Sequence, residues 1–326
     1  MGKLNMVKAL NFALLQEMER DADVLVMGED VGIDGGVFRV TEDLHRRFGA
    51  RRVIDSPLAE AAIVGTAVGM ALYGLKPVCE IQFSGFAFQG FHQIENHAAR
   101  YRQRSQGRFH CQMVVRMPFG GGVRALEHHS ESEEQFYAQI PGLKMVIPSG
   151  PRNARALLVS AIRDPDPVIF FEHKALYHAH REDVPDDVET LALGRAQVAR
   201  EGHDLTLVAY GAMVRVALEA AEVLRAEDGV ETEVIDLLTI APLDRETLVQ
   251  SVGKTGRAVI VHEAPRSFGP GAEIAASIME GAFLSLEAPI RRVTAYDVPF
   301  VGFAREKVNV PDVGRVVTAA RETLAF

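Results

Sequence analysis

Glu60 is the residue whose surroundings most favour chemistry. It closes the stretch Asp55-Ser-Pro-Leu-Ala-Glu60 and stands at the head of an uncharged segment that ends at Tyr73. We expect a helix over Ala59–Tyr73, and a helix that is apolar on all sides is normally buried. A carboxylate in its first turn is stabilised by the helix dipole, which requires no ligand. The alternative is a carboxyl group at the rim of a dry environment, where it shares a proton with a ligand nitrogen.

Two further stretches place polar and aromatic side chains just after predicted strands. The first, Gly28-Glu-Asp-Val-Gly-Ile-Asp-Gly-Gly-Val-Phe38, lacks the GxxxxGK[ST] pattern, and its carboxylates would repel a phosphate. It is an acidic surface loop, a loop that binds a divalent metal, or a loop that folds over a cofactor and places Glu29 beside it. In the second, Glu80-Ile-Gln-Phe-Ser-Gly-Phe86, Gln82 can hydrogen-bond an aminopyrimidine edge and Phe86 can stack on a flat ring. Composition alone favours core packing for both Phe83 and Phe86.

A histidine pair follows a triple glycine in the stretch from Met117 to Ser130. Adjacent residues point in different directions, so at most one of His128 and His129 faces a site. The pair alone is weak evidence for a metal centre. It is either a surface pair or a loop that carries one proton-transferring histidine.

The stretch Ser160-Ala-Ile-Arg-Asp-Pro-Asp-Pro167 ends a predicted helix and turns into a strand. A polar turn explains it. Its free carbonyl groups and aspartates can also hold a hard cation.

The elements that must position these residues alternate between short aliphatic strands and longer helices. Strands without polar alternation are buried on both faces, so we expect a doubly wound, mostly parallel α/β sheet followed by a smaller α/β domain. The predicted domains are 1–180 and 196–326, and the polar stretch 181–195 is the predicted linker. The strands expected in the first domain are Val24–Met27, Val53–Asp55, Pro77–Ile81, Met113–Arg116, Met145–Pro148 and Val168–Phe171, and the helices are Met6–Arg20, Ala59–Tyr73, Phe88–Arg104 and Arg152–Arg163.

Composition excludes several classes of function. The net charge of -9 argues against a nucleic-acid-binding surface. Cys79 and Cys111 lie in hydrophobic runs and are expected to be buried, reduced thiols. No segment reaches the length of a membrane span, and the first residues show no secretion signal, so we expect a cytoplasmic protein.

Taken in order, these segments resemble the beta subunits of pyruvate and branched-chain 2-oxo acid dehydrogenases. The similarity spans essentially the whole chain, and the collinear set is specific although no single motif is. The matching strings are GEDVG-x-x-GGVFR, DSPLAEAAIVG, EIQF-x-GF, PFGGGV, HSES, PGLKMVIPS, SAIRDPDPV and EVIDLLTIAPLD.

The resemblance implies a transketolase-like chain whose first domain binds the aminopyrimidine end of thiamine diphosphate. Glu60 would hydrogen-bond the pyrimidine ring and promote the imino tautomer that removes the thiazolium proton. Leu58, Gln82 and Glu29 match positions that line this pocket. Phe86 stands where branched-chain relatives often carry tyrosine, so a ring contact is kept and a hydroxyl is lost.

The resemblance also implies roles for the histidine loop and for the polar turn. His129 would be the active-site histidine that handles the intermediate or passes the acyl group to lipoyl, and His128 has no assigned role. A potassium site, present in part of the family, would be formed by Met113, Ala161, Ile162, Asp164 and Asp166.

The family's diphosphate and magnesium motif, which begins Gly-Asp-Gly and ends in Asn-Asn about 30 residues later, is not found in this sequence. The resemblance therefore implies an alpha subunit that brings Mg²⁺ and the diphosphate site, in an α2β2 assembly. The second domain would serve association and docking of the dihydrolipoyl acyltransferase core.

Three functions compete. The first is the dehydrogenase subunit, with pyruvate weakly favoured over branched-chain 2-oxo acids: Gln82–Phe86 and the PFGGG string resemble pyruvate enzymes, whereas His262-Glu-Ala-Pro and Glu172-x-Lys-x-Leu-Tyr177 resemble branched-chain enzymes. The second is a self-sufficient transketolase-like enzyme, which would need the diphosphate motif in the same chain. The third is a non-catalytic scaffold of the same fold.

Overall fold

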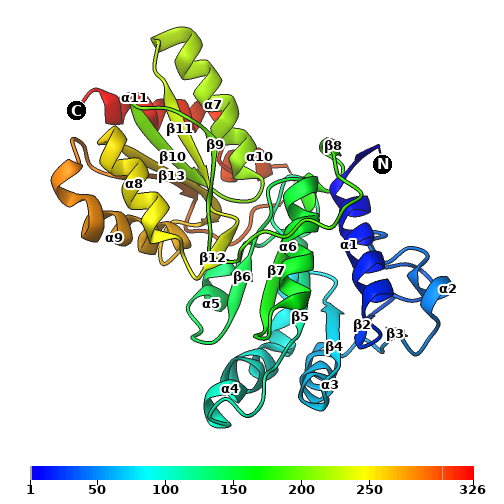
Figure 1. Ribbon diagram of the computed structural model, residues 1–326. Coiled ribbons are helices and arrows are strands. Elements are labelled where there is room, and N and C mark those ends of the chain that lie inside the picture. The colour runs from blue at the N-terminus through cyan, green and yellow to red at the C-terminus, as the bar shows by residue number, and fades with distance from the viewer. Residues whose placement is uncertain (1, 303) are drawn as a thin grey trace.

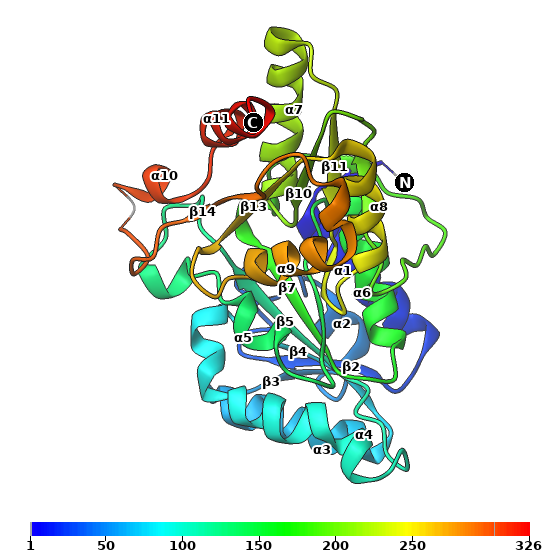
Figure 2. The same ribbon diagram turned by 90° about the vertical axis from the view of Figure 1, so that its left-hand side faces the viewer.

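The computed structural model describes residues 2–302 and 304–326. Two α/β domains are stacked, with the N-terminal domain below the C-terminal one in both ribbon views (Figure 1, Figure 2). The predicted fold class, a mostly parallel α/β sheet followed by a smaller α/β domain, is confirmed.

The first domain is built on a seven-stranded sheet in the order β12-β6-β7-β5-β4-β2-β3. All neighbours are parallel except β12 and β6. The strands are β2 (Val24–Gly28), β3 (Val53–Asp55), β4 (Lys76–Glu80), β5 (Val114–Phe119), β6 (Lys144–Val146), β7 (Val168–His173) and β12 (Thr239–Ala241).

Successive side chains of a strand point to opposite faces, and both faces of this sheet are buried. Val24 and Val26 pack under the helices α1 (Met6–Arg20) and α6 (Pro151–Arg163). Leu25 and Met27 face the other side, where α3 (Glu60–Tyr73) contributes Ile63. This burial on both faces explains why the strands are aliphatic throughout and lack polar alternation.

The second domain has a five-stranded sheet in the order β14-β13-β10-β11-β9, of which only the β9 pairing is antiparallel. Helices α7 and α11 cover one face, and α8 and α9 cover the other. The bounds are β9 (Gln197–Arg200), β10 (Leu205–Ala209), α7 (Met213–Asp228), β11 (Thr232–Asp236), α8 (Arg245–Thr255), β13 (Ala258–Pro265), α9 (Pro270–Ala282), β14 (Arg291–Ala295), α10 (Glu306–Asn309) and α11 (Val313–Leu324).

One hydrophobic core spans both domains. Met27 and Ile169 of the first sheet belong to the same packed cluster as Val208 and Ile260 of the second. The strand β12 strengthens this connection, because it leaves the second domain's chain and pairs with β6 in the first domain's sheet. This crossing was not predicted.

One expectation about the elements is corrected. The single helix predicted over Phe88–Arg104 is wrong: the segment is broken into a 3-10 turn (Ser84–Gln89), a π-helical turn (Gln93–His97), a second 3-10 turn (Ala98–Arg100) and α4 (Tyr101–Arg104). Gly90 explains the first break, since a Cβ atom there would lie 3.1 Å from the Glu60 carbonyl oxygen.

The predicted linker 181–195 is not free of structure. Its strand β8 (Glu182–Asp183) pairs with β1 (Lys3–Leu4) at the start of the chain. The Arg155 guanidinium holds the carbonyl of Asp187 at 2.9 Å. The segment is therefore fastened to the first domain, and the boundaries at 180 and 196 stay a prediction.

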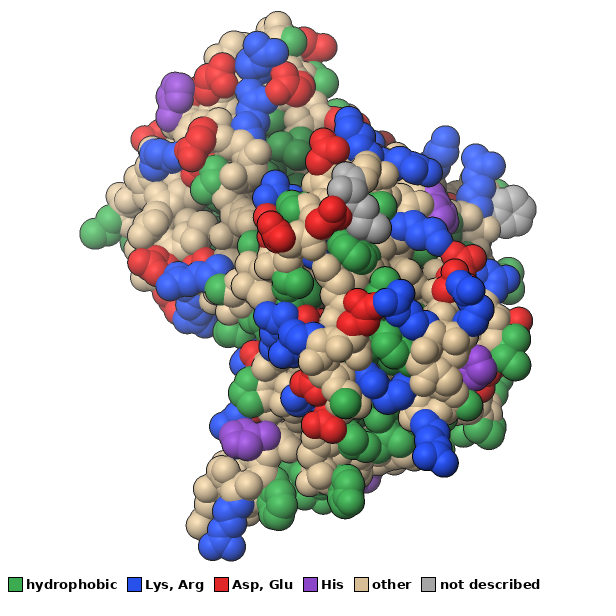
Figure 3. Space-filling view, turned by 45° about the vertical axis from the view of Figure 1, so that its right-hand side comes forward, with side chains coloured by type: hydrophobic (Ala, Val, Ile, Leu, Met, Phe, Trp, Pro, Cys, Tyr) green, Lys and Arg blue, Asp and Glu red, His purple; other side chains and the backbone are tan. Residues whose placement is uncertain are grey.

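On the face drawn in Figure 3, side chains of both charge signs are interspersed. Among residues 2–302 and 304–326, no helix combines the length and the apolar character that crossing a bilayer requires.

Candidate active site

The predicted pyrimidine-site residues meet where four neighbouring parallel strands end. Glu29 follows β2, Glu60 follows β3, Gln82 follows β4, and His129 lies on the loop after β5. The carboxyl ends of parallel strands form one rim of a sheet, where α/β proteins bind their ligands. Residues that are far apart in the sequence are thus brought to the same rim of the sheet.

The loops after β2 and β3 are tied together by Asp55. Its Oδ1 accepts a hydrogen bond from the Gly32 backbone N–H at 2.6 Å, and the Ser56 N–H donates to the Gly28 carbonyl at 2.9 Å. Gly32 must be glycine here, because a Cβ atom would lie 2.4 Å from Asp55 Oδ2. This close approach holds Glu29 beside Glu60. Burial, and then the charges of Asp30 and Glu60, raise the pKa of Glu29.

Glu60 occupies the first turn of α3, and only 9% of its surface is exposed. Within the described chain its carboxylate makes no hydrogen bond. Leu58, two residues earlier, is 71% exposed. The chain thus leaves this carboxylate available for a ligand group that can hydrogen-bond to it.

The expectation that α3 is buried on all sides is wrong for this single chain. Ala62, Thr66, Gly69 and Tyr73 form an exposed stripe along the helix, and Tyr73 is 87% exposed. Open space lies beyond Gly69, where an added Cβ atom would meet nothing within 4 Å. No segment of this chain covers the stripe in the described residues.

His129 is enclosed by aromatic rings at the same rim. Its ring centroid lies 4.2 Å from that of Phe83 and 5.3 Å from that of Phe86, both in edge-on geometry. Burial, followed by the nearby Lys174 charge, lowers the pKa of His129, so the imidazole is neutral at pH 7. Its Nδ1 is buried and has no partner, whereas the His128 side chain is exposed. One histidine of the pair therefore faces inward.

Gln82 is already engaged within the chain. Its amide Nε2 donates to Asp30 Oδ2 at 3.1 Å, which joins the strand ends of β4 and β2. Phe86 packs against Phe83 with 5.6 Å between ring centroids. Together with His129, the Phe83 and Phe86 rings form an aromatic wall at the same rim.

The residues predicted for a cation lie together at one turn, but their oxygens already have partners. The Met113 carbonyl accepts from the Val168 N–H, the Ala161 carbonyl from the Asp164 N–H, and the Ile162 carbonyl from the Gln112 amide. Lys144 Nζ lies 2.6 and 2.7 Å from the two Asp164 oxygens and 3.7 Å from Asp166 Oδ2. The chain's own ammonium thus supplies positive charge here, and the potassium site stays a prediction.

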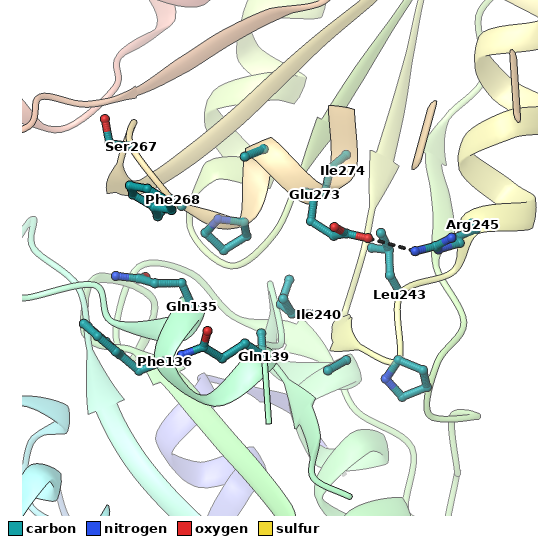
Figure 4. A pocket seen from close by; sticks show the side chains of 16 residues that line it. Gln135, Phe136, Gln139, Ile240, Leu243, Arg245, Ser267, Phe268, Glu273 and Ile274 are labelled. Carbon is teal, nitrogen blue, oxygen red and sulfur yellow. Dashed lines mark hydrogen bonds and ion pairs between the residues drawn. The ribbon is translucent and has the colours of Figure 1, made fainter. Parts of the chain in front are cut away.

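A separate cavity of about 860 Å³ lies between the domains (Figure 4). Three of the residues that line it are Phe136, Gln139 and Phe268. Phe136 lies in α5 (Glu134–Ala138), Gln139 caps the C-terminus of α5, and Phe268 precedes α9. The Arg245–Glu273 ion pair, with 2.8 Å between its atoms, lies along the wall. It includes none of the predicted site residues.

Sequence reasoning missed several residues that contact the histidine loop. Phe83 lies inside a quoted motif but was assigned to the core. Lys174 and Glu263 lie in strings that were used only to compare substrates. Both are buried charged residues next to histidines, a pattern that could have singled them out.

The arrangement suits a flat, nitrogen-bearing ring. Two neighbouring carboxyl groups can exchange a proton with ring nitrogens, and aromatic side chains can hold the ring's faces. The described rim offers no basic cradle for phosphates, since the loop beside Glu29 is acidic.

Comparison with known proteins supports this description. Residues 2–179 match the family model "Transketolase, pyrimidine binding domain" and residues 194–313 match "Transketolase, C-terminal domain". The chain is 50% identical over 326 residues to "Pyruvate dehydrogenase E1 component subunit beta" of Staphylococcus epidermidis (strain ATCC 12228 / FDA PCI 1200), with 100% of both chains covered. It is 49% identical, at the same coverage, to the protein of that name from Staphylococcus aureus (strain MW2).

Among solved structures, "Split gene transketolase, inactive beta4 tetramer" is similar with a TM-score of 0.80. The match covers 99% of each chain at 24% sequence identity. At that identity the likeness concerns the fold.

Proposed function

The chain belongs to the family of 2-oxo acid dehydrogenase E1 beta subunits, and from this premise we propose that it completes a thiamine-diphosphate site for oxidative decarboxylation of pyruvate. The observation that carries the proposal is the meeting of Glu29, Glu60, Gln82, Phe86 and His129 at one rim of the sheet.

The residues present fit the aminopyrimidine half of the coenzyme. The unpartnered Glu60 carboxylate can receive or donate a proton at a ring nitrogen, and the partly buried Glu29 lies beside it. Leu58 and Phe86 supply apolar contacts, and Gln82 supplies an amide. When bound, thiamine diphosphate supplies the electron sink that decarboxylation of a 2-oxo acid needs.

Within the site, each side chain has a distinct task. Glu60 would hold the proton at the ring nitrogen, as a positioned carboxyl group can. The neutral imidazole of His129 can accept or donate a proton beside the reacting acyl group and assist its transfer to lipoyl. The Phe83 and Phe86 rings fix the orientation of that imidazole.

An alpha subunit is required to complete this site. The sequence lacks the diphosphate motif, and the loop that contains Glu29 is acidic, so Mg²⁺ and the two phosphates must be held elsewhere. The exposed Leu58 and the open stripe of α3 suit a helix of the alpha subunit, since small residues permit close approach. We propose an α2β2 assembly that also docks a dihydrolipoyl acyltransferase core.

The relatives named as pyruvate dehydrogenase components favour pyruvate over branched-chain 2-oxo acids. The branched-chain substrate is the second candidate, because the His262-Glu-Ala-Pro and Glu172–Tyr177 strings resemble that type. Cytoplasmic location and a bound potassium ion stay predictions from the sequence.

The test is reconstitution. The purified chain is assayed alone and with its alpha subunit for thiamine diphosphate binding and for reduction of an artificial electron acceptor by pyruvate and by 2-oxoisovalerate. We expect binding and turnover only in the mixture, with a higher kcat/KM for pyruvate. An inactive mixture, or tight coenzyme binding and turnover by the chain alone, would contradict the proposal.

A further inference from the structure

The loop that carries His129 is hydrogen-bonded to side chains of the second domain. Within Gly120–Ser130, the backbone N–H of Gly121 donates to Glu263 Oε1. The N–H groups of Gly122 and Arg124 donate to the two carboxylate oxygens of Glu306, at 2.7 and 3.1 Å. Glu263 lies in β13 and Glu306 opens α10, so both acceptors belong to the second domain.

The carboxylates of Glu263 and Glu306 are both buried. Glu263 is 4% exposed and Glu306 is 3% exposed. Burial by itself would raise the pKa of Glu263, but His173, the Gly121 N–H and Lys174 together lower it. His173 Nε2 lies 2.7 Å from the second oxygen of Glu263. Each oxygen of that carboxylate therefore has a partner, as a buried charge requires.

The loop backbone is shaped to receive these anions. Gly120, Gly122 and Arg124 have φ values of 79°, 85° and 57°, and such left-handed conformations turn successive N–H groups toward one concave side. A Cβ atom on Gly121 would lie 3.1 and 3.2 Å from Oε1 of Glu306 and of Glu263. The triple glycine thus permits close contact with both carboxylates.

Residues of the first domain also hydrogen-bond to this loop. Lys174 donates to the Gly120 carbonyl oxygen, and the Gly120 N–H donates to the Glu131 carbonyl at 2.9 Å, which closes the loop. The Lys174 ammonium lies 5.9 Å from the centroid of the Phe83 ring, the ring that contacts His129. The anchored start of the loop and the placement of His129 are therefore mechanically connected.

We propose that Glu263 and Glu306 are positioning residues: they fix the backbone of Gly120–Ser130 so that His129 stays against Phe83 and Phe86. The inference rests on the proposed function, in which His129 assists acyl transfer. Neither glutamate touches the reacting atoms. The second domain thereby contributes to chemistry at a rim built entirely from the first.

The test uses Glu306→Gln and Glu306→Ala in the complex reconstituted with the alpha subunit. Glutamine preserves packing but offers one acceptor oxygen in place of two, so it keeps the test interpretable if alanine impairs folding. Glu219→Gln is the matched control, because that exposed carboxylate of α7 pairs with Arg215 on its own helix, 3.7 Å away. Amide hydrogen exchange and tryptic cleavage after the exposed Arg124 report on the loop.

We expect both Glu306 variants to exchange faster at Gly122 and Arg124, by at least tenfold for alanine, and to be cleaved faster after Arg124. Acyl transfer to lipoyl should fall at least tenfold in Glu306→Ala, with little change in KM for the 2-oxo acid. The control should match the wild type.

The decisive comparison repeats Glu306→Ala in a His129→Ala background. If Glu306 acts through His129, the second substitution adds little to the first. Equal losses in both backgrounds, or unchanged exchange of the loop amides, would overturn the inference. A wild-type complex without turnover refutes the proposed function instead, and unchanged amide exchange then still overturns the anchoring itself.

Discussion

At the scale of single residues, a substitution of Glu60 tests whether its carboxylate is catalytic or only stabilises a helix. We expect Glu60→Gln to lower turnover of the reconstituted complex by about 10²–10⁴-fold, because the proton at the coenzyme ring can no longer be exchanged. Steady-state rates with an artificial electron acceptor measure the loss, and gel filtration checks assembly.

Glu246→Gln is the control, since Glu246 also lies in the first turn of a helix, α8, where its carboxylate contacts Arg195 at 3.0 Å on the surface and lies away from the proposed site. Each substitution should change the free energy of unfolding by about 0.3–1 kcal/mol. Equal activity of the two variants would reduce Glu60 to a helix-stabilising residue.

His262 gives the molecule a measurable acid sensitivity. Burial, followed by the charge of Arg292, lowers its pKa to about 3, while its unfolded pKa is near 6.5. Between these values the unfolded chain binds a proton that the folded chain does not, so this group's contribution makes stability fall as the pH falls from about 6.5 toward 3. The slope is about 1.4 kcal/mol per pH unit.

Urea unfolding of the wild type and of His262→Gln, followed between pH 4 and pH 6, tests this difference in slope. Glutamine retains an acceptor for the Gly271 N–H, which His262 Nε2 now receives at 3.2 Å. Parallel pH dependences for the two proteins would show that His262 does not resist protonation.

The sequence identified Glu60, His129, Gln82 and Phe86 because each lies within a short motif next to a strand end. It could not identify Glu263 or Glu306 as partners of the glycine loop. Those contacts join residues 142 and 184 positions apart in the chain, and only the packing of two domains creates them.

At the scale of elements, α3 carries a stripe that this chain leaves open. We expect Gly69→Met to maintain or raise the chain's own stability, by up to about 1 kcal/mol, because methionine favours a helix more than glycine does. The same side chain should weaken association with the alpha subunit at least tenfold, since it fills the space that a partner helix needs. Thermal unfolding and titration with the alpha subunit measure the two effects.

Gly253→Met is the matched control, because Gly253 also lies within an exposed helix turn with nothing within 4 Å of an added Cβ atom. It should stabilise similarly and leave association unchanged. Equal association of the two variants would remove α3 from the interface.

The elements themselves were largely predictable. The helix Met6–Arg20 and the strand Val53–Asp55 coincide with their predicted bounds. The predicted helix Phe88–Arg104 did not, because its local helical pattern is overridden where Gly90 packs against the Glu60 backbone.

At the scale of the whole molecule, the shared core predicts that the domains unfold together. Removal of residues 196–326 would expose Phe119 and Ile147, which lie beside Gly211 of the second domain, and delete β12. We therefore expect the fragment 1–195 to aggregate or to lack a cooperative thermal transition, while the full chain melts in a single step. Circular dichroism and light scattering test this. A monomeric fragment with its own sharp transition would contradict it.

The position of β12 also constrains how the protein is made. The ribosome releases the N-terminal sheet strand by strand, yet the outermost partner of β6 lies at Thr239–Ala241, close to 100 residues later. Until that stretch emerges, β6 presents an open hydrogen-bonding flank of the kind that recruits wrong partners. The nascent chain is thus most vulnerable to misassembly midway through translation. By then Glu29, Glu60 and His129 have already been synthesised.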